Sequence, residues 1–177
     1  MLKTSNTDLN RLSVEQYKST PKLPLVIVLD NVRSAHNVGS AFRTCDSFAA
    51  EHLYLCGITP TPPNRDIYKT ALSAEQSVAW SYYKNASELL IKLKEKNYTI
   101  IAVEQAKEHL LLNNFEVTKF NNMAFVFGNE VEGVSQEIMD CVDLCIEIPQ
   151  FGSKHSLNVS VSLGVVLWEA AKQFMNK

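Results

Sequence analysis

The amino-acid sequence predicts an α/β protein with a mostly parallel sheet flanked by helices. Short, continuous apolar runs recur along the chain, and segments of helical character separate them. A continuous apolar run is typical of a strand that is covered on both faces, as the strands of parallel sheets are. Repeated alternation of strands and helices favours one parallel sheet. With 177 residues, 46% of them hydrophobic, the chain is long enough for one domain with a sizeable core.

The first strand is expected at residues 25–29, where the sequence Leu-Val-Ile-Val-Leu is apolar throughout. A helix over 38–48 follows, with Asn37 as its candidate N-cap, and a second strand is expected at 52–55. Residues 57–65 contain three prolines and are expected to form a loop. This order places the segment before the first helix at the carboxyl end of a parallel strand, where ligands gather in open α/β sheets.

The middle of the chain continues the alternation. A strand is expected at 77–82 and a helix at 86–96, whose leucines form an apolar face while its lysines lie on the solvated side. Three further buried strands are expected at 99–103, 124–127 and 144–148.

The last segment fits two local structures. Apolar and polar residues alternate from Leu157 to Leu163, and this period indicates a strand. Its length favours one helix from Ser156 to Phe174, with Ser156 as the N-cap and Gly164 tolerated at a cost of about 1 kcal/mol. We expect the helix, covered on both faces, which requires a partner surface for one of them.

Charge is distributed unevenly along the chain. The net charge is -2 and the pI about 6.1, so no general basic field indicates a nucleic-acid partner. Between residues 104 and 147 there are nine acidic residues and two lysines. A polyanion would therefore have to bind away from that stretch. The basic residues available for it are Arg33, Arg43, Arg65, Lys69 and Lys154.

Other classes of protein are disfavoured by composition. No run approaches the roughly 18 apolar residues of a membrane span, and the polar start does not resemble a signal peptide. We expect a soluble cytoplasmic protein with no membrane partner. Its four cysteines show no CxxC pair, and reduced thiols are favoured over a metal site. They are Cys45, Cys56, Cys141 and Cys145.

Three segments carry candidate chemistry. They read Asn37-x-Gly39-x-x-x-Arg43, then Phe127-Gly128-Asn129-Glu130-x-x-Gly133, then Ile148-Pro149-x-x-Gly152-x-x-x-Ser156-Leu157-Asn158. Gly39 permits the close approach of another group. Taken alone, each segment has a structural explanation: a capped helix with a solvated arginine, a turn with a solvated carboxylate, and the start of a helix. No Gly-x-Gly-x-x-Gly follows the first strand, which argues against NAD binding.

In this order and spacing the three segments resemble the motifs of the SpoU (TrmH-like) RNA methyltransferases of the SPOUT superfamily. The resemblance covers about residues 24–174 and is closest to compact, stand-alone members. It implies a domain over 24–177 after a short N-terminal appendage over 1–23, and a deep trefoil knot in the carboxyl-terminal part of the sheet. Knots are exceptions to ordinary topology, so periodicity could not have predicted one. It also implies S-adenosyl-L-methionine as the cofactor and a homodimer through the C-terminal helix.

The resemblance further implies transfer of a methyl group to a ribose 2′-hydroxyl of tRNA or rRNA. The alternative is a catalytically idle, knotted RNA-binding or assembly factor. The implied catalytic residues are Arg43, Asn37, Glu130, Ser156 and Asn158. The implied cofactor-binding residues are Val103, Glu104, Gly128, Ile148, Gly152, Ser156 and Leu157. The candidates for RNA binding are Arg33, Arg43, Arg65 and Lys154, with His36 and His155 as weaker ones.

Overall fold

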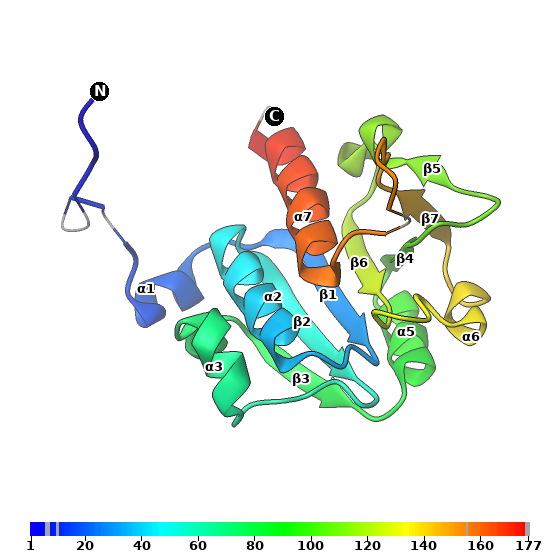
Figure 1. Ribbon diagram of the computed structural model, residues 1–177, viewed down its shortest axis with the longest axis horizontal. Coiled ribbons are helices and arrows are strands. Elements are labelled where there is room, and N and C mark those ends of the chain that lie inside the picture. The colour runs from blue at the N-terminus through cyan, green and yellow to red at the C-terminus, as the bar shows by residue number, and fades with distance from the viewer. Residues whose placement is uncertain (6–7, 10, 155, 176–177) are drawn as a thin grey trace.

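The structure is a computed structural model that describes residues 1–5, 8–9, 11–154 and 156–175. Within these residues, seven parallel strands form one central sheet in the order β3-β2-β1-β6-β4-β7-β5 (Figure 1). The strands are β1 (Leu23–Asp30), β2 (Ala50–Cys56), β3 (Trp80–Tyr83), β4 (Tyr98–Val103), β5 (Leu110–Leu111), β6 (Asn122–Phe127) and β7 (Leu144–Glu147). The predicted α/β class with a parallel sheet is confirmed.

Helices cover both faces of this sheet. They are α1 (Val14–Ser19), α2 (Ala35–Ser47), α3 (Arg65–Ala71), α4 (Ala74–Ser77), α5 (Ala86–Glu95), α6 (Gln136–Met139) and α7 (Val159–Met175), with 3-10 turns at Leu112–Asn114 and Val117–Lys119. On one face α2 packs against α7, α3 and α4, whereas α5 and α6 lie on the other (Figure 1).

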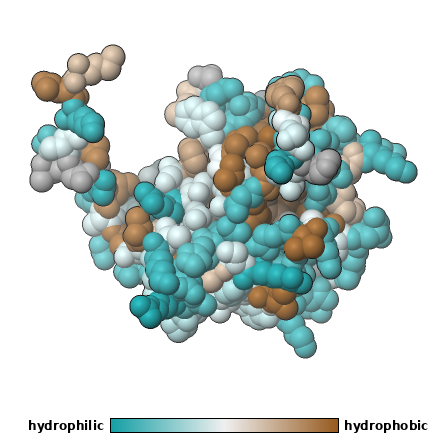
Figure 2. Space-filling view, viewed as in Figure 1, coloured by the Kyte–Doolittle hydropathy of each residue, from teal (hydrophilic) through white to brown (hydrophobic). Residues whose placement is uncertain are grey.

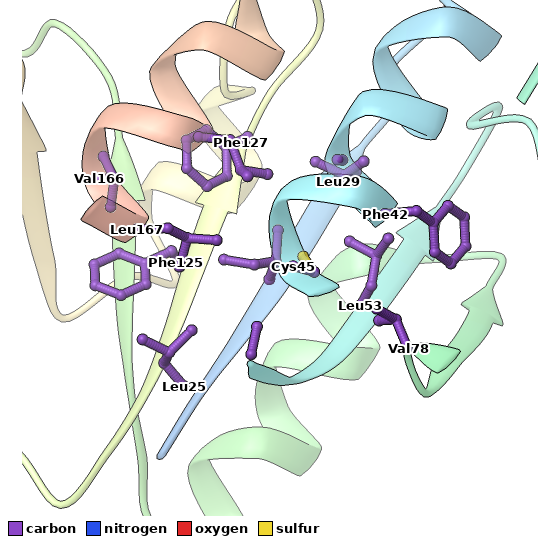
Figure 3. Close-up of a cluster of buried hydrophobic side chains, with 14 of the residues drawn as sticks. Leu25, Leu29, Phe42, Cys45, Leu53, Val78, Phe125, Phe127, Val166 and Leu167 are labelled. Atoms are coloured by element: carbon purple, nitrogen blue, oxygen red, sulfur yellow. The ribbon is translucent and has the colours of Figure 1, made fainter. Parts of the chain in front are cut away.

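Two hydrophobic cores, one on each face, hold the layers together. The core under α2 and α7 contains Leu25, Leu29, Phe125 and Phe127 from the strands and Phe42, Cys45, Val166 and Leu167 from the helices (Figure 3). The core under α5 contains Val26, Val28, Ile100, Val126, Leu89, Leu90 and Leu93. Alternate residues of β1 therefore enter opposite cores, which is why its sequence is apolar without interruption.

Most of the predicted elements are confirmed. Five strands lie where the apolar runs predicted them, with ends that differ by at most two residues. The strand predicted at 77–82 is wrong in its first part, because residues 74–77 form α4 and β3 begins only at Trp80. The hydroxyl of Ser77 donates to the Ala74 carbonyl at 3.0 Å. This hydrogen bond within one turn stabilises a helical turn here, rather than the pairing of a strand with its neighbour.

The prediction of Asn37 as the N-cap of the helix expected at 38–48, which is α2, is wrong. The helix α2 begins three residues before Val38, and Ser34 is its N-cap: the Ser34 hydroxyl accepts a hydrogen bond from the Asn37 N–H at 3.3 Å. Serine is as good an N-cap as asparagine, so the sequence offered two candidates. Because Ser34 serves as the cap, the side chain of Asn37 is left free for other partners.

The last helix also begins at a different residue. It was predicted from Ser156, but α7 begins at Val159. The side chain of Asn158 accepts hydrogen bonds from the Ser160 N–H at 2.9 Å and from the Ser160 hydroxyl at 2.7 Å. Asn158 therefore takes the capping role that was predicted for Ser156. The helical alternative over the strand is confirmed.

Gly39 allows α3 to lie directly on α2. A Cβ built at Gly39 would stand 2.1 Å from the hydroxyl of Thr70 and 2.3 Å from the carbonyl oxygen of Ile67. The Thr70 hydroxyl donates to the backbone carbonyl of His36 at 2.9 Å, which fixes the two helices further. The close approach that Gly39 permits is thus made by another helix of the chain.

The segment before the sheet packs against α2 and α4. Tyr17 of α1 is 7% exposed, and its hydroxyl donates to the carbonyl of Cys45 at 3.3 Å. The ammonium group of Lys22 lies 3.5 Å from the centre of the Tyr17 ring. Across the described residues, no helix is both long enough and apolar enough to cross a membrane.

Candidate functional site

A cavity of about 470 Å³ lies where β4, β6 and β7 end at the same edge of the sheet. Three segments form its wall: the end of β4, the turn after β6, and the stretch between β7 and α7. The residues that line it are 103–105, 127–133, 147, 148, 150, 156–159 and 162. The carboxyl edge of a parallel sheet is where ligand sites of α/β proteins are built.

The turn after β6 is held in a fixed shape by its own backbone. Asn129 and Gly133 exchange two backbone hydrogen bonds of 2.9 Å each, and the side chain of Asn129 accepts from the Val131 N–H at 2.8 Å. Gly133 has a φ of +69°, which favours glycine. A Cβ on Gly133 would also stand 2.2 Å from a carboxylate oxygen of Glu104.

Glu104 joins the end of β4 to this turn. One of its carboxylate oxygens accepts from the Val134 N–H at 2.8 Å, and the other accepts from the Gln105 N–H at 2.8 Å. Two walls of the cavity are therefore linked by a charged acceptor, whose hydrogen bonds are stronger than those of neutral groups.

Glu130 links the same turn to the start of α2. Its two carboxylate oxygens accept three hydrogen bonds, from the Arg33 N–H at 2.9 Å, the Ser34 N–H at 3.1 Å and the side-chain amide of Asn37 at 2.9 Å. The first turn of a helix presents unpaired N–H groups and a positive end of the helix dipole, and a carboxylate satisfies both.

These bonds also set the charge of Glu130. Partial desolvation works to raise its pKa, but the hydrogen bonds from the Arg33 N–H, the Asn37 amide and the Ser34 N–H outweigh it and hold the pKa below the ordinary value. The side chain is thus a carboxylate at neutral pH, as the three donors require.

Asn158 completes a chain of hydrogen bonds through the three sequence motifs. Its amide donates to the side-chain oxygen of Asn37 at 3.1 Å, while the amide of Asn37 donates to Glu130. Asn37 and Glu130 are 93 positions apart, and Asn37 and Asn158 are 121 positions apart. The first motif, the turn after β6 and the start of α7 therefore meet at one place beside the cavity.

The structure brings most of the predicted site residues to this cavity. Those that line it are Val103, Glu104, Gly128, Glu130, Ile148, Ser156, Leu157 and Asn158. Asn37 does not line it but is joined to it through Glu130 and Asn158. Gly152 and Lys154 lie on the exposed stretch between β7 and α7.

The remaining basic candidates lie around the first turn of α2 and beyond it. Arg33 precedes α2, Arg43 is exposed on α2, and Arg65 is the exposed first residue of α3. None of these three lines the cavity within the described residues. His36 is exposed in the first turn of α2, and His155 lies outside the described residues.

Several residues of the wall were not predicted. Gln105, Asn129, Glu132, Glu147 and Gln150 also line the cavity. Asn129 and Glu132 lie within the second motif, and this position could have indicated that they line the cavity. Glu147 is the last residue of a strand, and its carboxylate lies 3.3 Å from the imidazole of His109, a pairing that no sequence spacing indicates.

Comparison with known proteins assigns this site to a family. The model of the SpoU rRNA Methylase family matches residues 24–168, most of the chain. The chain belongs to the SpoU family. The three motifs that meet at the cavity lie inside the matched region, and the predicted family is confirmed.

Individual relatives agree with this assignment. The tRNA (guanosine(18)-2′-O)-methyltransferase of Aquifex aeolicus is 32% identical over 155 residues, which are 84% of this chain and 69% of that protein. The 23S rRNA (guanosine-2′-O-)-methyltransferase RlmB of Neisseria meningitidis is 31% identical over 85% of this chain, which spans 59% of RlmB. SpoU relatives with two different RNA substrates are thus almost equally similar to this chain.

The fold agrees as well. The crystal structure of the Aquifex aeolicus TrmH/SpoU tRNA modifying enzyme superposes with a TM-score of 0.82 over 92% of this chain and 81% of that one, at 28% identity. Membership of the SpoU family gives the chain the knotted SPOUT variant of the parallel α/β fold, as the motifs predicted.

Proposed function

We propose that this SpoU-family chain transfers the methyl group of S-adenosylmethionine to a ribose 2′-hydroxyl of tRNA or rRNA. The observation that carries the proposal is the hydrogen-bonded chain Glu130–Asn37–Asn158, which joins the three family motifs beside the cavity. Two relatives with about equal identity act on tRNA and on 23S rRNA, and this is why both substrate classes are kept.

The cavity suits the proposed donor. Its volume lies within the roughly 300–1,000 Å³ of small-molecule sites. The apolar side chains of Val103, Ile148 and Leu157 lie on its wall, while Glu104 and Glu132 add negative charge. An apolar wall with carboxylates fits an aromatic base attached to a sulfonium cation. When bound, S-adenosylmethionine supplies an electrophilic methyl group on a positively charged sulfur.

Backbone groups are proposed to bind the donor. Gly128 allows the backbone at Gly133 to pack closely behind it in the cavity wall, and Val103, Ile148 and Leu157 offer peptide groups at the wall. Gly152 belongs to the same motif as Ile148 and Leu157, and it is proposed to keep the backbone of the stretch before α7 flexible. Ser156 lines the cavity with an exposed hydroxyl, which is proposed to bind donor or RNA.

The first turn of α2 is proposed to hold the RNA backbone. Glu130 fixes the position of Asn37 and of the peptide before α2, and the exposed side chains of Arg33 and Arg43 are free to contact phosphates. A guanidinium does not give up its proton in proteins, so Arg43 is assigned to phosphate binding and charge stabilisation. The proton of the 2′-hydroxyl passes to a phosphate oxygen or to water. Arg65 and Lys154 are proposed as outer phosphate contacts.

A homodimer through α7 is the proposed assembly. The helix exposes Val161, Val165 and Trp168, with exposed fractions of 50%, 37% and 51%. Their spacing puts them on one side of the helix, and Figure 2 shows apolar surface over α7. A second copy of the same helix would cover this face. It would also supply the partner surface that the apolar pattern of this segment requires.

Replacing Trp168 by glutamate is expected to give a monomer, because a charge would be buried in the proposed interface without a partner. Light scattering during size-exclusion chromatography measures the mass. Ile91→Glu is the matched control, since Ile91 is also an exposed apolar residue (56%) but lies on α5. A wild-type protein that elutes as a monomer would contradict the dimer.

Lowering the pH is expected to weaken the link between the turn after β6 and α2. The pKa of Glu130 is lowered in the folded state, so its stabilising effect is complete above the ordinary glutamate pKa of about 4.3 and is lost as the pH falls through the lower folded value. The difference in urea stability between wild type and Glu130→Gln should therefore shrink below about pH 4. Glu132→Gln, in the same turn but outside these three bonds, is the matched control for the loss of a carboxylate.

Titration calorimetry with S-adenosylmethionine tests the enzyme proposal. The wild-type protein should bind the donor at one site per chain. A factor that only binds RNA is not expected to bind S-adenosylmethionine. A protein that gives no heat of binding and no protection of α7 from proteolysis by the donor would favour the idle RNA-binding alternative.

A further inference from the structure

A second groove lies on the opposite side of α2 from the cavity wall, beside the edge strand β3. Its lining comes from the loop before α3, from α3 and α4, and from the first residue of β3. The residues are Pro62, Pro63, Tyr68, Leu72, Ser73, Glu75, Gln76 and Trp80. Its volume is about 810 Å³, large enough for a flat organic group.

Aromatic and apolar side chains are exposed here. Tyr68 of α3 is 42% exposed, and Leu72, the C-cap residue of α3, is 62% exposed. Trp80 is half-buried at the groove and is anchored from the core side by the ring of Phe42, with ring centres 6.1 Å apart at 90°. Two aromatic residues that face one groove are a suitable site for stacking a planar ring.

The exposed face of α3 is also cationic. Arg65, Tyr68 and Lys69 follow the spacing of one helical face, and all three are exposed. Lys69 shares its charge with Asp66 at 2.5 Å, but its side chain remains 52% exposed. Cations that alternate with an aromatic ring suit a ligand that combines planar bases with phosphates.

Glu75 forms part of the wall of this groove. Its Oε2 atom is buried and has no hydrogen-bond partner within the described part of the chain, and its Oε1 has only a long contact of 3.5 Å with the amide of Gln76. A buried acceptor without a donor is costly, and the cost would be removed if the Glu75 side chain turned toward the groove and met an N–H group of a ligand. Glutamate is an acceptor only, so the ligand must donate.

The groove is rigidly connected to the candidate active site. α3 lies directly on α2 at Gly39, and the hydroxyl of Thr70 is bonded to the backbone of His36 in the first turn of α2. That same turn carries Asn37, which is bonded to Glu130 and Asn158. A ligand held by α3 is therefore held at a fixed distance from the first turn of α2.

We infer that this groove binds an unpaired nucleobase of the RNA substrate, one that carries an amino-group donor, with guanine preferred. The base stacks on Tyr68 and Trp80, the Glu75 side chain turns toward the groove, and the N–H groups of the base donate to its carboxylate. Guanine presents a ring N–H beside an amino group, which a carboxylate accepts together, whereas uracil offers no amino group. Arg65 contacts the neighbouring phosphate. The inference rests on the proposed function only in taking RNA as the occupant.

Fluorescence of Trp80 tests this inference directly. The sequence has two tryptophans, so Trp168→Phe leaves Trp80 as the only reporter. In this background, four pentanucleotides that differ only in the central base, U-U-N-U-U, are titrated into the protein. We expect quenching by stacking, with the guanine oligonucleotide binding about tenfold more tightly than the all-uracil one.

Variants assign the effect to the groove. Tyr68→Ala should weaken binding of all four oligonucleotides about tenfold or more, and Tyr68→Phe, which keeps the ring, should not. Glu75→Gln should leave the stacking and remove most of the preference for guanine. In methyl transfer, Tyr68→Ala should raise the KM for RNA while kcat and the affinity for S-adenosylmethionine stay unchanged.

Three results would overturn the inference: no quenching by any oligonucleotide, equal affinity for the four bases, or a change of Trp80 fluorescence with protein concentration alone, which would assign the groove to a second copy. None of these would affect donor binding in calorimetry. Failure of the groove and failure of the methyltransferase proposal are therefore distinguishable.

Discussion

Replacing Arg43 by alanine is expected to reduce methyl transfer by about a hundredfold or more and to leave donor affinity unchanged. Arg43 is exposed on α2 and lies outside the wall of the cavity, so its side chain supports no part of the donor site. Its proposed role is to hold a phosphate of the RNA and to stabilise charge that develops during transfer, and groups of this kind contribute about 10²–10³ in rate. Single-turnover methyl transfer measures the rate, and calorimetry measures donor binding.

Two further variants sharpen this result. Arg11→Ala removes another exposed arginine, from the N-terminal segment, and should retain full activity. Arg43→Lys keeps the charge but loses the two-pronged contact with phosphate, so it should fall between wild type and alanine. If Arg43→Ala lost donor binding and activity to the same extent, the assignment of Arg43 to the RNA side of the reaction would be wrong.

Replacing Gly128 by alanine is expected to have the opposite profile, with donor binding lost first. A Cβ at Gly128 would stand 2.2 Å from the carbonyl carbon and oxygen of Gly133 and 2.3 Å from the backbone nitrogen of Val134. These are backbone atoms of the cavity wall, so the turn must move to make room. Overpacking of this kind costs about 1–3 kcal/mol of stability. Because the displaced turn is the wall itself, we expect donor affinity to fall at least about tenfold.

Gly152→Ala is the matched control for this variant. A Cβ at Gly152 meets no described atom within 4 Å, so the added methyl group should cost little stability. Urea unfolding and calorimetry on the two variants separate a general effect of glycine loss from a specific effect on the wall. Equal donor affinity for Gly128→Ala and wild type would show that the donor does not bind at this turn. A reduced affinity of Gly152→Ala for S-adenosylmethionine would indicate that Gly152 contacts the donor.

The strands were predictable because each depends on local sequence. Residues of β1 alternate between two cores, and a short run that is apolar at every position is typical of a strand covered on both faces. The short helices α3 and α4 were not predicted. They follow a proline-rich loop, have only seven and four residues, and depend on packing against α2, which α3 contacts at Gly39.

The candidate site was predictable only in part. The motifs placed Glu130, Asn37 and Asn158 in it, but their mutual hydrogen bonds join residues 93 and 121 positions apart, which no local pattern encodes. The choice of Ser34 as the cap of α2 was equally hidden, since Asn37 is an acceptable cap on propensity alone. The fold of the knot followed from family resemblance, because the general rules of topology exclude it.

Methyl transfer to RNA is the most direct test of the proposed function. The purified protein is incubated with S-adenosylmethionine carrying a labelled methyl group and with total RNA from a strain that lacks its gene, and the RNA is digested to nucleosides. Wild type should produce a labelled 2′-O-methylnucleoside from tRNA or rRNA, and Arg43→Ala should not. Label on a base instead of a ribose, or no label despite measurable donor binding, would contradict the assignment of this site to ribose 2′-O-methylation.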